Sequence, residues 1–147
     1  MKRHLLLPCL LLAATSAHAQ SGAAPCPHLD AASGLAWEHL AGPDYDFCRA
    51  LDGAGTQVLG VYVGADSPFK PDRDLAAERG NIDGQAITWY SSELAGEPDA
   101  QVRETLITLP DGRKAHVWLR ADNRRELAGK LELAQGLRFE PVLLTGQ

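Results

Sequence analysis

The chain has 147 residues, with 14 Lys and Arg against 19 Asp and Glu, and 45% of its residues are apolar. The apolar content is too high for a disordered chain, and the length suits one domain. The acidic balance argues against a nucleic-acid-binding protein, which needs a basic surface to displace the counterions of the phosphates.

Residues 1–19 have the pattern of a secretory signal peptide. Lys2 and Arg3 form a positive start, an apolar stretch follows, and Ala17 and Ala19 are the small residues that signal peptidase selects. The apolar stretch is too short to span a bilayer, which takes about 20 residues. Arg outnumbers Lys, and Ala and Gly are abundant, as is typical of bacteria with GC-rich genomes. We therefore expect cleavage after Ala19 and a periplasmic or secreted bacterial protein without a transmembrane segment.

Cleavage would remove Cys9 and leave two cysteines, Cys26 and Cys48. An even number of cysteines in an oxidising compartment predicts a disulfide bond between them. The alternative, a redox-active pair, usually has the spacing Cys-x-x-Cys, which these two positions do not have. Cleavage also removes two basic residues and no acidic one, so 12 basic against 19 acidic residues leave a formal charge of −7.

The first half of the mature chain begins with a predicted flexible arm over residues 20–34, which are small, polar and Pro-containing. A single domain is expected over residues 35–147. Residues 35–40 fit either one helical turn or a short strand. Side chains alternate over residues 44–52, and residues 57–63 are rich in Val, Leu and Tyr, which together predict a hairpin of two strands.

The middle of the chain alternates between breaks and strands. Residues 64–80 contain two Pro and many charged residues and predict a long loop. Residues 85–91 alternate as a strand, and residues 93–100 read as a polar connection. Residues 101–109 and 113–121, joined by Pro-Asp-Gly, form the clearest hairpin.

After residue 121 the apolar period changes from that of a strand to that of a helix. Asn123 and Glu126 have the spacing of a capping box, and Gly136 marks the end of the helix. The apolar positions that repeat on one helical face are Leu127, Leu131 and Ala134. Residues 137–141 then alternate up to a proline, which predicts a short final edge strand.

These elements predict an α+β fold. We expect an antiparallel sheet of five or six hairpin-linked strands, one C-terminal amphipathic helix packed on one face, and the short final strand. Because one helix covers only one face, the opposite face must be solvated or must curl over itself as a half-barrel. A chain of this size buries about two thirds of its unfolded surface, which is enough for one core.

The sequence contains no arrangement that identifies an enzyme. The three histidines of the mature chain, His28, His39 and His116, have no metal-ligand spacing, so we expect no metal and no cofactor. No Gly-x-Ser-x-Gly elbow surrounds a serine. The paired aspartates do not continue into a calcium-binding loop. The many Asp and Glu residues leave open a pair of carboxylates for glycoside hydrolysis.

Two surfaces are candidate binding sites. His116, Trp118 and Arg120 alternate along one strand and therefore share a face, and Trp and Arg are enriched at binding hot spots. Phe69 lies between two prolines in the 64–80 loop and is a candidate anchor for a partner. Structural explanations compete with both: Trp118 would complete a second small core, Arg120 would pair with a cross-strand carboxylate, and Phe69 would fold back over the core edge.

These features favour a small exported binding protein without catalytic activity. The more specific form is an inhibitor, immunity or accessory protein that acts on an envelope protein, and the negative charge would steer it toward a basic partner. Two alternatives remain. One is a small-ligand carrier with an apolar pocket between helix and sheet, lined by Tyr62, Trp89 and Trp118. The other is an envelope hydrolase with an unrecognised site.

Overall fold

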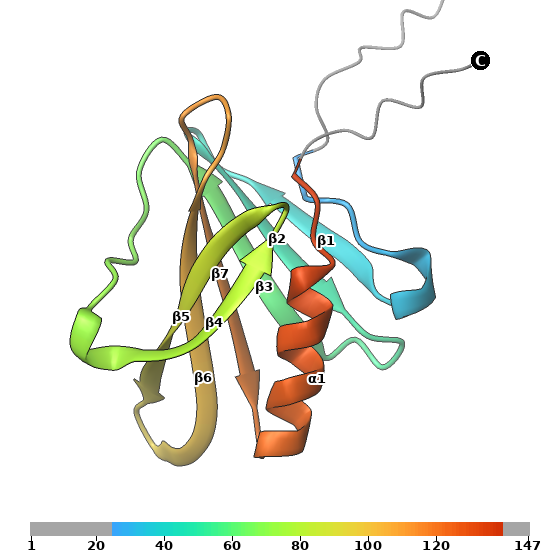
Figure 1. Cartoon of the computed structure of the whole chain (residues 1–147). Coiled ribbons are helices and arrows are strands. Elements are labelled where there is room, and N and C mark those ends of the chain that lie inside the picture. The colour runs from blue at the N-terminus through green and yellow to red at the C-terminus, as the bar shows by residue number, and fades with distance from the viewer. Residues whose placement is uncertain (1–24, 140–147) are drawn as a thin grey trace, which may run out of the picture.

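The computed structural model describes residues 25–139 (Figure 1). The predicted signal peptide, Cys9 and the last two residues of the predicted final strand lie outside the described residues. The described part forms one antiparallel sheet with a single α-helix, α1 (Arg124–Gln135), after the last strand. The predicted α+β class is confirmed, but the expected count of five or six strands is wrong, because the sheet has seven.

The strands in chain order are β1 (Ala36–Ala41), β2 (Tyr45–Leu51), β3 (Gln57–Gly64), β4 (Ala76–Ile82), β5 (Gln85–Leu94), β6 (Glu97–Thr108) and β7 (Lys114–Ala121), with the short 3-10 helices η1 (Ala31–Ser33) and η2 (Arg73–Leu75). Their order in the sheet is β1-β2-β3-β7-β6-β5-β4, and every neighbouring pair is antiparallel. The sheet curls toward α1, so that central β7 and edge strand β4 both contact the helix (Figure 1). No α-helix within residues 25–139 is long and apolar enough to cross a membrane.

The seventh strand, β4, begins inside residues 64–80, the segment predicted to be a loop, and ends at Ile82. Its sequence has few strand-favouring residues, and two contacts with the rest of the sheet hold it in place. Ile82 is fully buried, and Glu78 forms an ion pair with Arg103 of β6, with Oε2 2.6 Å from Nε. The pairing of β4 with β5 through the turn at Asp83 and Gly84 therefore overrides the weak local signal.

The structure also corrects two other predictions from the sequence. The polar connection predicted over residues 93–100 is the end of β5 and the start of β6, which meet at a tight turn with Gly96 at a φ of 84°. These residues are polar because they are exposed, although they are strand residues. The described part of the predicted final strand adds no strand to the sheet: Arg138 makes an isolated bridge with His28 of the N-terminal segment.

The core lies between the sheet and α1. The predicted helix start is confirmed, because the Asn123 side chain accepts a hydrogen bond from the Glu126 amide at 3.0 Å. Leu127 and Ala134 of α1 are buried against alternate residues of the central strands. The largest fully buried side chains of the core include Trp89, Leu59, Ile82, Ile107, Leu119, Leu137, Val61 and Val117.

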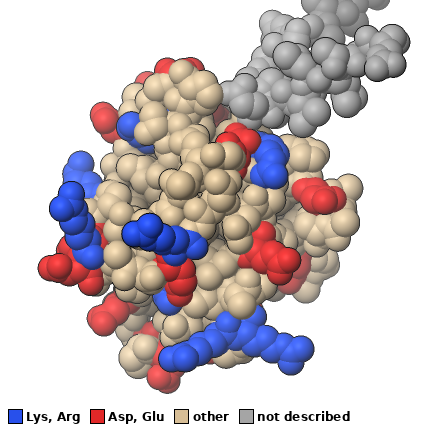
Figure 2. Space-filling model, viewed as in Figure 1, with Lys and Arg blue, Asp and Glu red and all other residues tan. Residues whose placement is uncertain are grey.

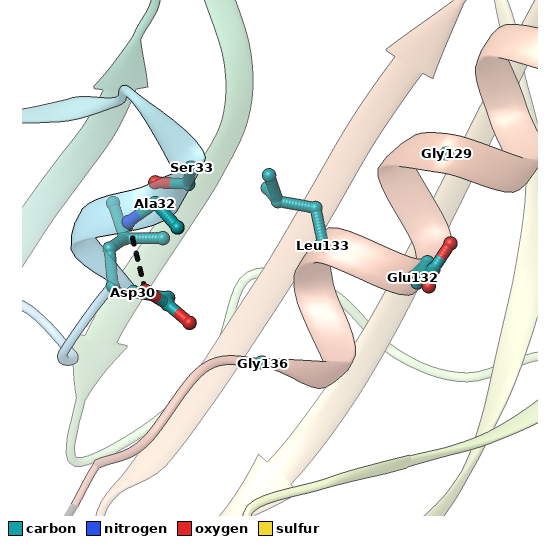
Figure 3. Close-up of a pocket in the computed structure, with 8 residues that line it drawn as sticks. Asp30, Ala32, Ser33, Gly129, Glu132, Leu133 and Gly136 are labelled. Carbon is teal, nitrogen blue, oxygen red and sulfur yellow. Dashed lines mark hydrogen bonds between the residues drawn. The ribbon is translucent and has the colours of Figure 1, made fainter.

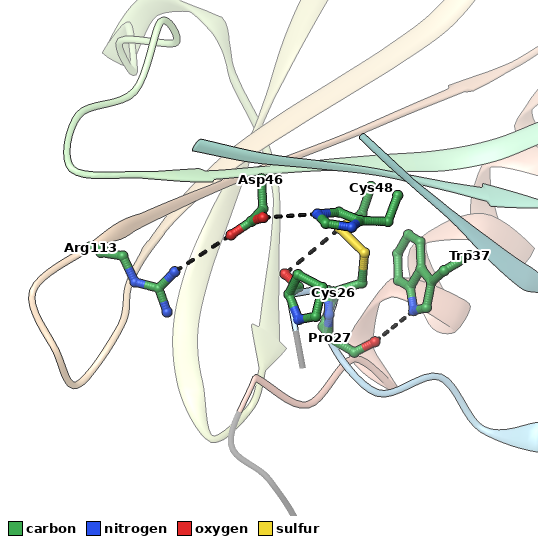
Figure 4. The surroundings of a disulfide bond; sticks show 8 residues. Cys26, Pro27, Trp37, Asp46, Cys48 and Arg113 are labelled. Carbon is green, nitrogen blue, oxygen red and sulfur yellow. Dashed lines mark hydrogen bonds and ion pairs between the residues drawn. A yellow bond between two sulfur atoms is a disulfide. The ribbon is translucent and has the colours of Figure 1, made fainter. Parts of the chain in front are cut away.

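The predicted disulfide is present and joins Cys26 to Cys48 of β2, with Cα atoms 5.8 Å apart (Figure 4). Beside it, the Trp37 indole N–H donates a hydrogen bond to the Pro27 carbonyl at 2.6 Å. The segment that precedes β1, expected from sequence to be part of a flexible arm, is thus tied to β2 by a covalent bond and to β1 by a hydrogen bond.

Gly129, in the middle of α1, offers a first stability prediction. A Cβ atom built at this position has no heavy atom within 4 Å, and glycine disfavours a helix interior. We expect Gly129→Ala to raise the free energy of unfolding by about 1 kcal/mol, measured by urea denaturation. Gly136→Ala is the control and should not gain stability, because its Cβ would lie 3.1 Å from the Leu133 carbonyl oxygen. An unchanged free energy of unfolding in Gly129→Ala would contradict the prediction.

Candidate functional site

The sheet face opposite α1 carries a cluster of aromatic side chains. Alternation along β7 sends Val117 and Leu119 into the core under the helix and turns His116 and Trp118 to the other side. Its rings come from four strands and one loop. They form a stacked pair, Tyr45 with Tyr62, and a series of contacts from Phe47 through Trp118, His116 and Phe69 to Tyr90. We call this surface the aromatic face, and its members are Tyr45, Phe47, Tyr62, Phe69, Tyr90, His116 and Trp118.

The register of the sheet brings these side chains together from distant parts of the sequence. One row across the strands runs from Leu40 through Phe47, Tyr62 and His116 to Leu106. The next row runs from Arg49 through Gly60, Trp118 and Glu104 to Tyr90. Neighbours in one row of an antiparallel sheet lie close enough for direct side-chain contact.

Gly60 explains how Trp118 is positioned. A Cβ atom at residue 60 would lie 2.1 Å from Cζ2 of Trp118, so the indole ring lies directly on the backbone of β3. The Phe47 ring flanks it, with centroids 5.3 Å apart. Trp118 nevertheless remains half-buried, so part of its ring is available to a partner.

The loop between β3 and η2 crosses the aromatic face and brings Phe69 onto it. The Phe69 ring stacks on His116, with centroids 4.9 Å apart and planes inclined by 11°, and also contacts Tyr90 at 5.9 Å. The two separate surfaces expected from sequence are therefore one surface. Phe69 folds back onto the sheet, on the side away from α1.

A hydrogen-bonded pair, His116 and Glu104, lies within the aromatic face. His116 Nε2 is 3.1 Å from Glu104 Oε1, and His116 is only 8% exposed. The hydrogen bond from His116 lowers the pKa of Glu104 below its ordinary value, against the opposing effect of burial. Charge attraction to His116 and a hydrogen bond from Ser92 lower this pKa further. Glu104 is therefore held as a carboxylate at neutral pH.

Ser92 does not form a catalytic triad with these two residues. Ser92 and His116 lie in rows of the sheet on either side of the row that contains Glu104. A serine nucleophile needs its hydroxyl on the histidine, with the acid on the other ring nitrogen. Here the carboxylate lies between the serine and the histidine, so the arrangement has no activated nucleophile.

Arg120, the remaining predicted site residue, is exposed near the end of β7 and is already paired. Its guanidinium contacts Glu97 of the neighbouring strand, and its Nη1 is 2.9 Å from Oδ1 of Asp122. The structure thus brings His116, Trp118 and Phe69 together and leaves Arg120 at the margin. Sequence reasoning missed Phe47 and Glu104, which strand alternation would have placed on this face once the strand order was known. It named Tyr62 only for the pocket of the carrier alternative.

A hollow of about 260 Å³ opens on the aromatic face, lined by Phe47, Tyr62, Pro68, Glu104, His116 and Trp118. Trp89 does not line it, because Trp89 is 1% exposed and packed in the core on the helix side of the sheet. Tyr62 and Trp118 are therefore separated from Trp89 by the sheet, although the carrier hypothesis placed all three in one pocket.

The helix side of the molecule also has hollows. One of about 350 Å³ lies between η1 and α1, where Leu133 and Gly129 meet Asp30 and Ser33 (Figure 3). On the face of the molecule seen in Figure 2, Lys and Arg side chains are interspersed with Asp and Glu, without a large patch of one sign. This side therefore offers a partner neither a cluster of aromatic side chains nor a single sign of charge.

The Glu104–His116 pair predicts a pH dependence of stability. Because the folded state lowers the pKa of Glu104 below 4.5, the unfolded chain takes up the proton first as the pH falls. The stabilisation is complete above the unfolded pKa and is lost as the pH falls through the lower folded value. We expect the difference in free energy of unfolding between wild type and Glu104→Gln to shrink from pH 5.5 to pH 3. Glu132→Gln, with the same charge change on α1, is the control; a constant difference for Glu104→Gln would contradict the prediction.

Comparison with known proteins adds no functional assignment. No protein-family model matches the sequence, and searches of curated proteins and of solved structures give no match either. Among residues 25–139, no group of three or more His, Cys, Asp and Glu side chains is placed to hold a metal ion.

Proposed function

We propose that this chain is an exported, non-catalytic binding protein that docks a basic envelope or secreted protein on its aromatic face. The observation that carries the proposal is the cluster of half-buried aromatic rings on the face opposite α1. An exposed apolar surface of this kind marks an interaction site. Aromatic side chains such as Trp and Tyr are enriched among the residues that dominate binding at protein interfaces.

Exposed apolar side chains extend the aromatic face toward the edge of the sheet. Leu40 of edge strand β1 is 51% exposed and lies directly across from Phe47. Tyr45, which is 40% exposed, stacks on Tyr62 with ring centroids 5.1 Å apart. A partner that covered the hollow would bury these side chains as well, and the contact would then have the apolar centre and polar rim of a protein interface.

The charge of the chain favours a basic partner. The formal charge of −7 expected after cleavage would steer a positively charged protein toward this domain, and raise the rate of association most at low salt. The disulfide is consistent with the proposed export. An inhibitor, immunity or accessory protein of an envelope enzyme would have these properties.

The test is a crosslinking pull-down of the mature, disulfide-bonded protein from envelope extract at low and high salt, read by mass spectrometry. We expect one dominant basic protein that is lost at high salt and lost again with Trp118→Ala. Leu133→Ala, in the hollow beside α1, is the matched control and should retain the partner. Retention by Trp118→Ala with loss in Leu133→Ala would move the docking site to the helix side and overturn the proposal.

Trp118→Ala must also remain folded for this test to be informative. We expect its far-UV circular dichroism and cooperative unfolding to be retained, because its ring is half-buried and lies outside the helix-side core. An unfolded variant would show that Trp118 is needed for the fold, and the site hypothesis would fail.

A further inference from the structure

We infer that the hollow of the aromatic face binds one cationic side chain, Lys or Arg, of the partner. This inference rests on the proposed function and identifies the group that enters the site. The walls of the hollow, its acidic group, its size and the pairing of nearby charges support it.

The walls of the hollow suit a cation. Phe47, Tyr62 and Trp118 each contribute a ring to the lining. The negative face of an aromatic ring attracts a Lys ammonium or Arg guanidinium within about 6 Å, and Trp is the strongest of the three. The absence of a side chain at Gly60 lets the Trp118 indole lie against the backbone of β3, so its position is already set by the sheet.

Glu104 selects a cation over an apolar guest. Its carboxylate lies in the lining beside the three rings, and its hydrogen bond with His116 favours the ionised form. An apolar side chain that filled the hollow would remove water from this carboxylate without replacing the lost interactions, which is costly. A guanidinium or ammonium would replace them with a charge-assisted hydrogen bond.

The size of the hollow fits a single side chain. Its volume of about 260 Å³ is below the range of about 300–1,000 Å³ that is usual for pockets of drug-sized ligands. A side chain enters with the rest of its protein outside, so a small and partly open hollow is sufficient. This favours a protein-borne cation over a carried small molecule.

Nearby basic groups on the same face already have partners of their own. Arg49 contacts Glu38 on the neighbouring strand, and Arg120 contacts Glu97 and Asp122. These arginines are therefore ion-paired with carboxylates other than Glu104. Glu104, which is hydrogen-bonded to His116 and Ser92, is the carboxylate within the lining, so an incoming cation would find an acceptor there.

The experiment titrates the mature, disulfide-bonded protein at pH 8 with n-butylguanidinium and with its neutral isostere n-butylurea. Binding is followed by the NMR shift of the Trp118 indole N–H, identified by its loss in Trp118→Phe. We expect a saturable shift with the guanidinium and none with the urea. Glu104→Gln should weaken guanidinium binding at least tenfold, whereas Glu132→Gln on α1 should leave it unchanged.

The outcomes separate this inference from the proposed function. Equal binding of the guanidinium and the urea, or an undiminished affinity in Glu104→Gln, would overturn the cation site. If wild type still captured a basic protein through Trp118 in that case, the proposed function would stand with another anchor. If guanidinium bound as expected and no basic partner were captured, the cation site would stand and the proposed function would fail.

Discussion

Replacing Trp89 by Ala is expected to lower the free energy of unfolding by about 3–5 kcal/mol, the range for removing a large buried aromatic side chain. Trp89 is 1% exposed and is the largest fully buried side chain of the core. Its Nε1 and Cδ1 lie 3.1 Å and 3.5 Å from the position of a Cβ on Gly80, so the indole packs against the backbone of β4. Its removal would leave a cavity beneath the edge strand that sequence reasoning did not find.

The measurement is urea denaturation of Trp89→Ala beside Trp118→Ala. The two residues are of the same type and lie in neighbouring parts of one sheet, but on opposite faces. We expect the loss for Trp118→Ala to be clearly smaller, because its half-buried ring leaves less apolar surface to expose and no closed cavity. Equal losses would mean that the aromatic face is a second core, and that Trp118 serves the fold through packing alone.

The fold could be predicted where the side-chain pattern is strong. The hairpin of β6 and β7 has strict alternation and a Pro-Asp-Gly turn, and α1 has its cap and apolar period in the sequence itself. Strand β4 could not be predicted, because its pairing depends on Ile82 and on the ion pair of Glu78 with Arg103, which are contacts between distant residues. Local propensity carries no information about such contacts.

In the candidate site, too, the local side-chain pattern predicts some features, whereas others depend on contacts between distant residues. Alternation placed His116 and Trp118 on one face of one strand, and this needed no knowledge of the neighbours. The stacking of Phe69 on His116 depends on how the loop crosses the sheet. The contact of Glu104 with His116 depends on the pairing of β6 with β7. The sequence therefore indicated single members of the site, and the register of the sheet assembled them.

Removing the disulfide is the second change with a large expected effect. The Cys26–Cys48 bond closes a loop across 22 positions of sequence, for which the chain-entropy relation gives about 3 kcal/mol. We expect reduction of the native protein to lower the free energy of unfolding in urea by about this amount. Reduction is preferred to substitution of Cys48 alone, because Cys48 is fully buried and its replacement would also alter packing.

The double variant Cys26→Ala/Cys48→Ala is the control for reduction. Its free energy of unfolding should not change with reductant, and any difference from the reduced protein measures the packing of Cys48. Without the bond, the segment before β1 retains the Trp37 hydrogen bond to Pro27 and the bridge between His28 and Arg138. If the free energy of unfolding of the wild type did not change with reductant, these contacts would be enough to hold the segment before β1 without the disulfide. A loss near 3 kcal/mol would make the stability of the domain dependent on an oxidising compartment, as the proposed export requires.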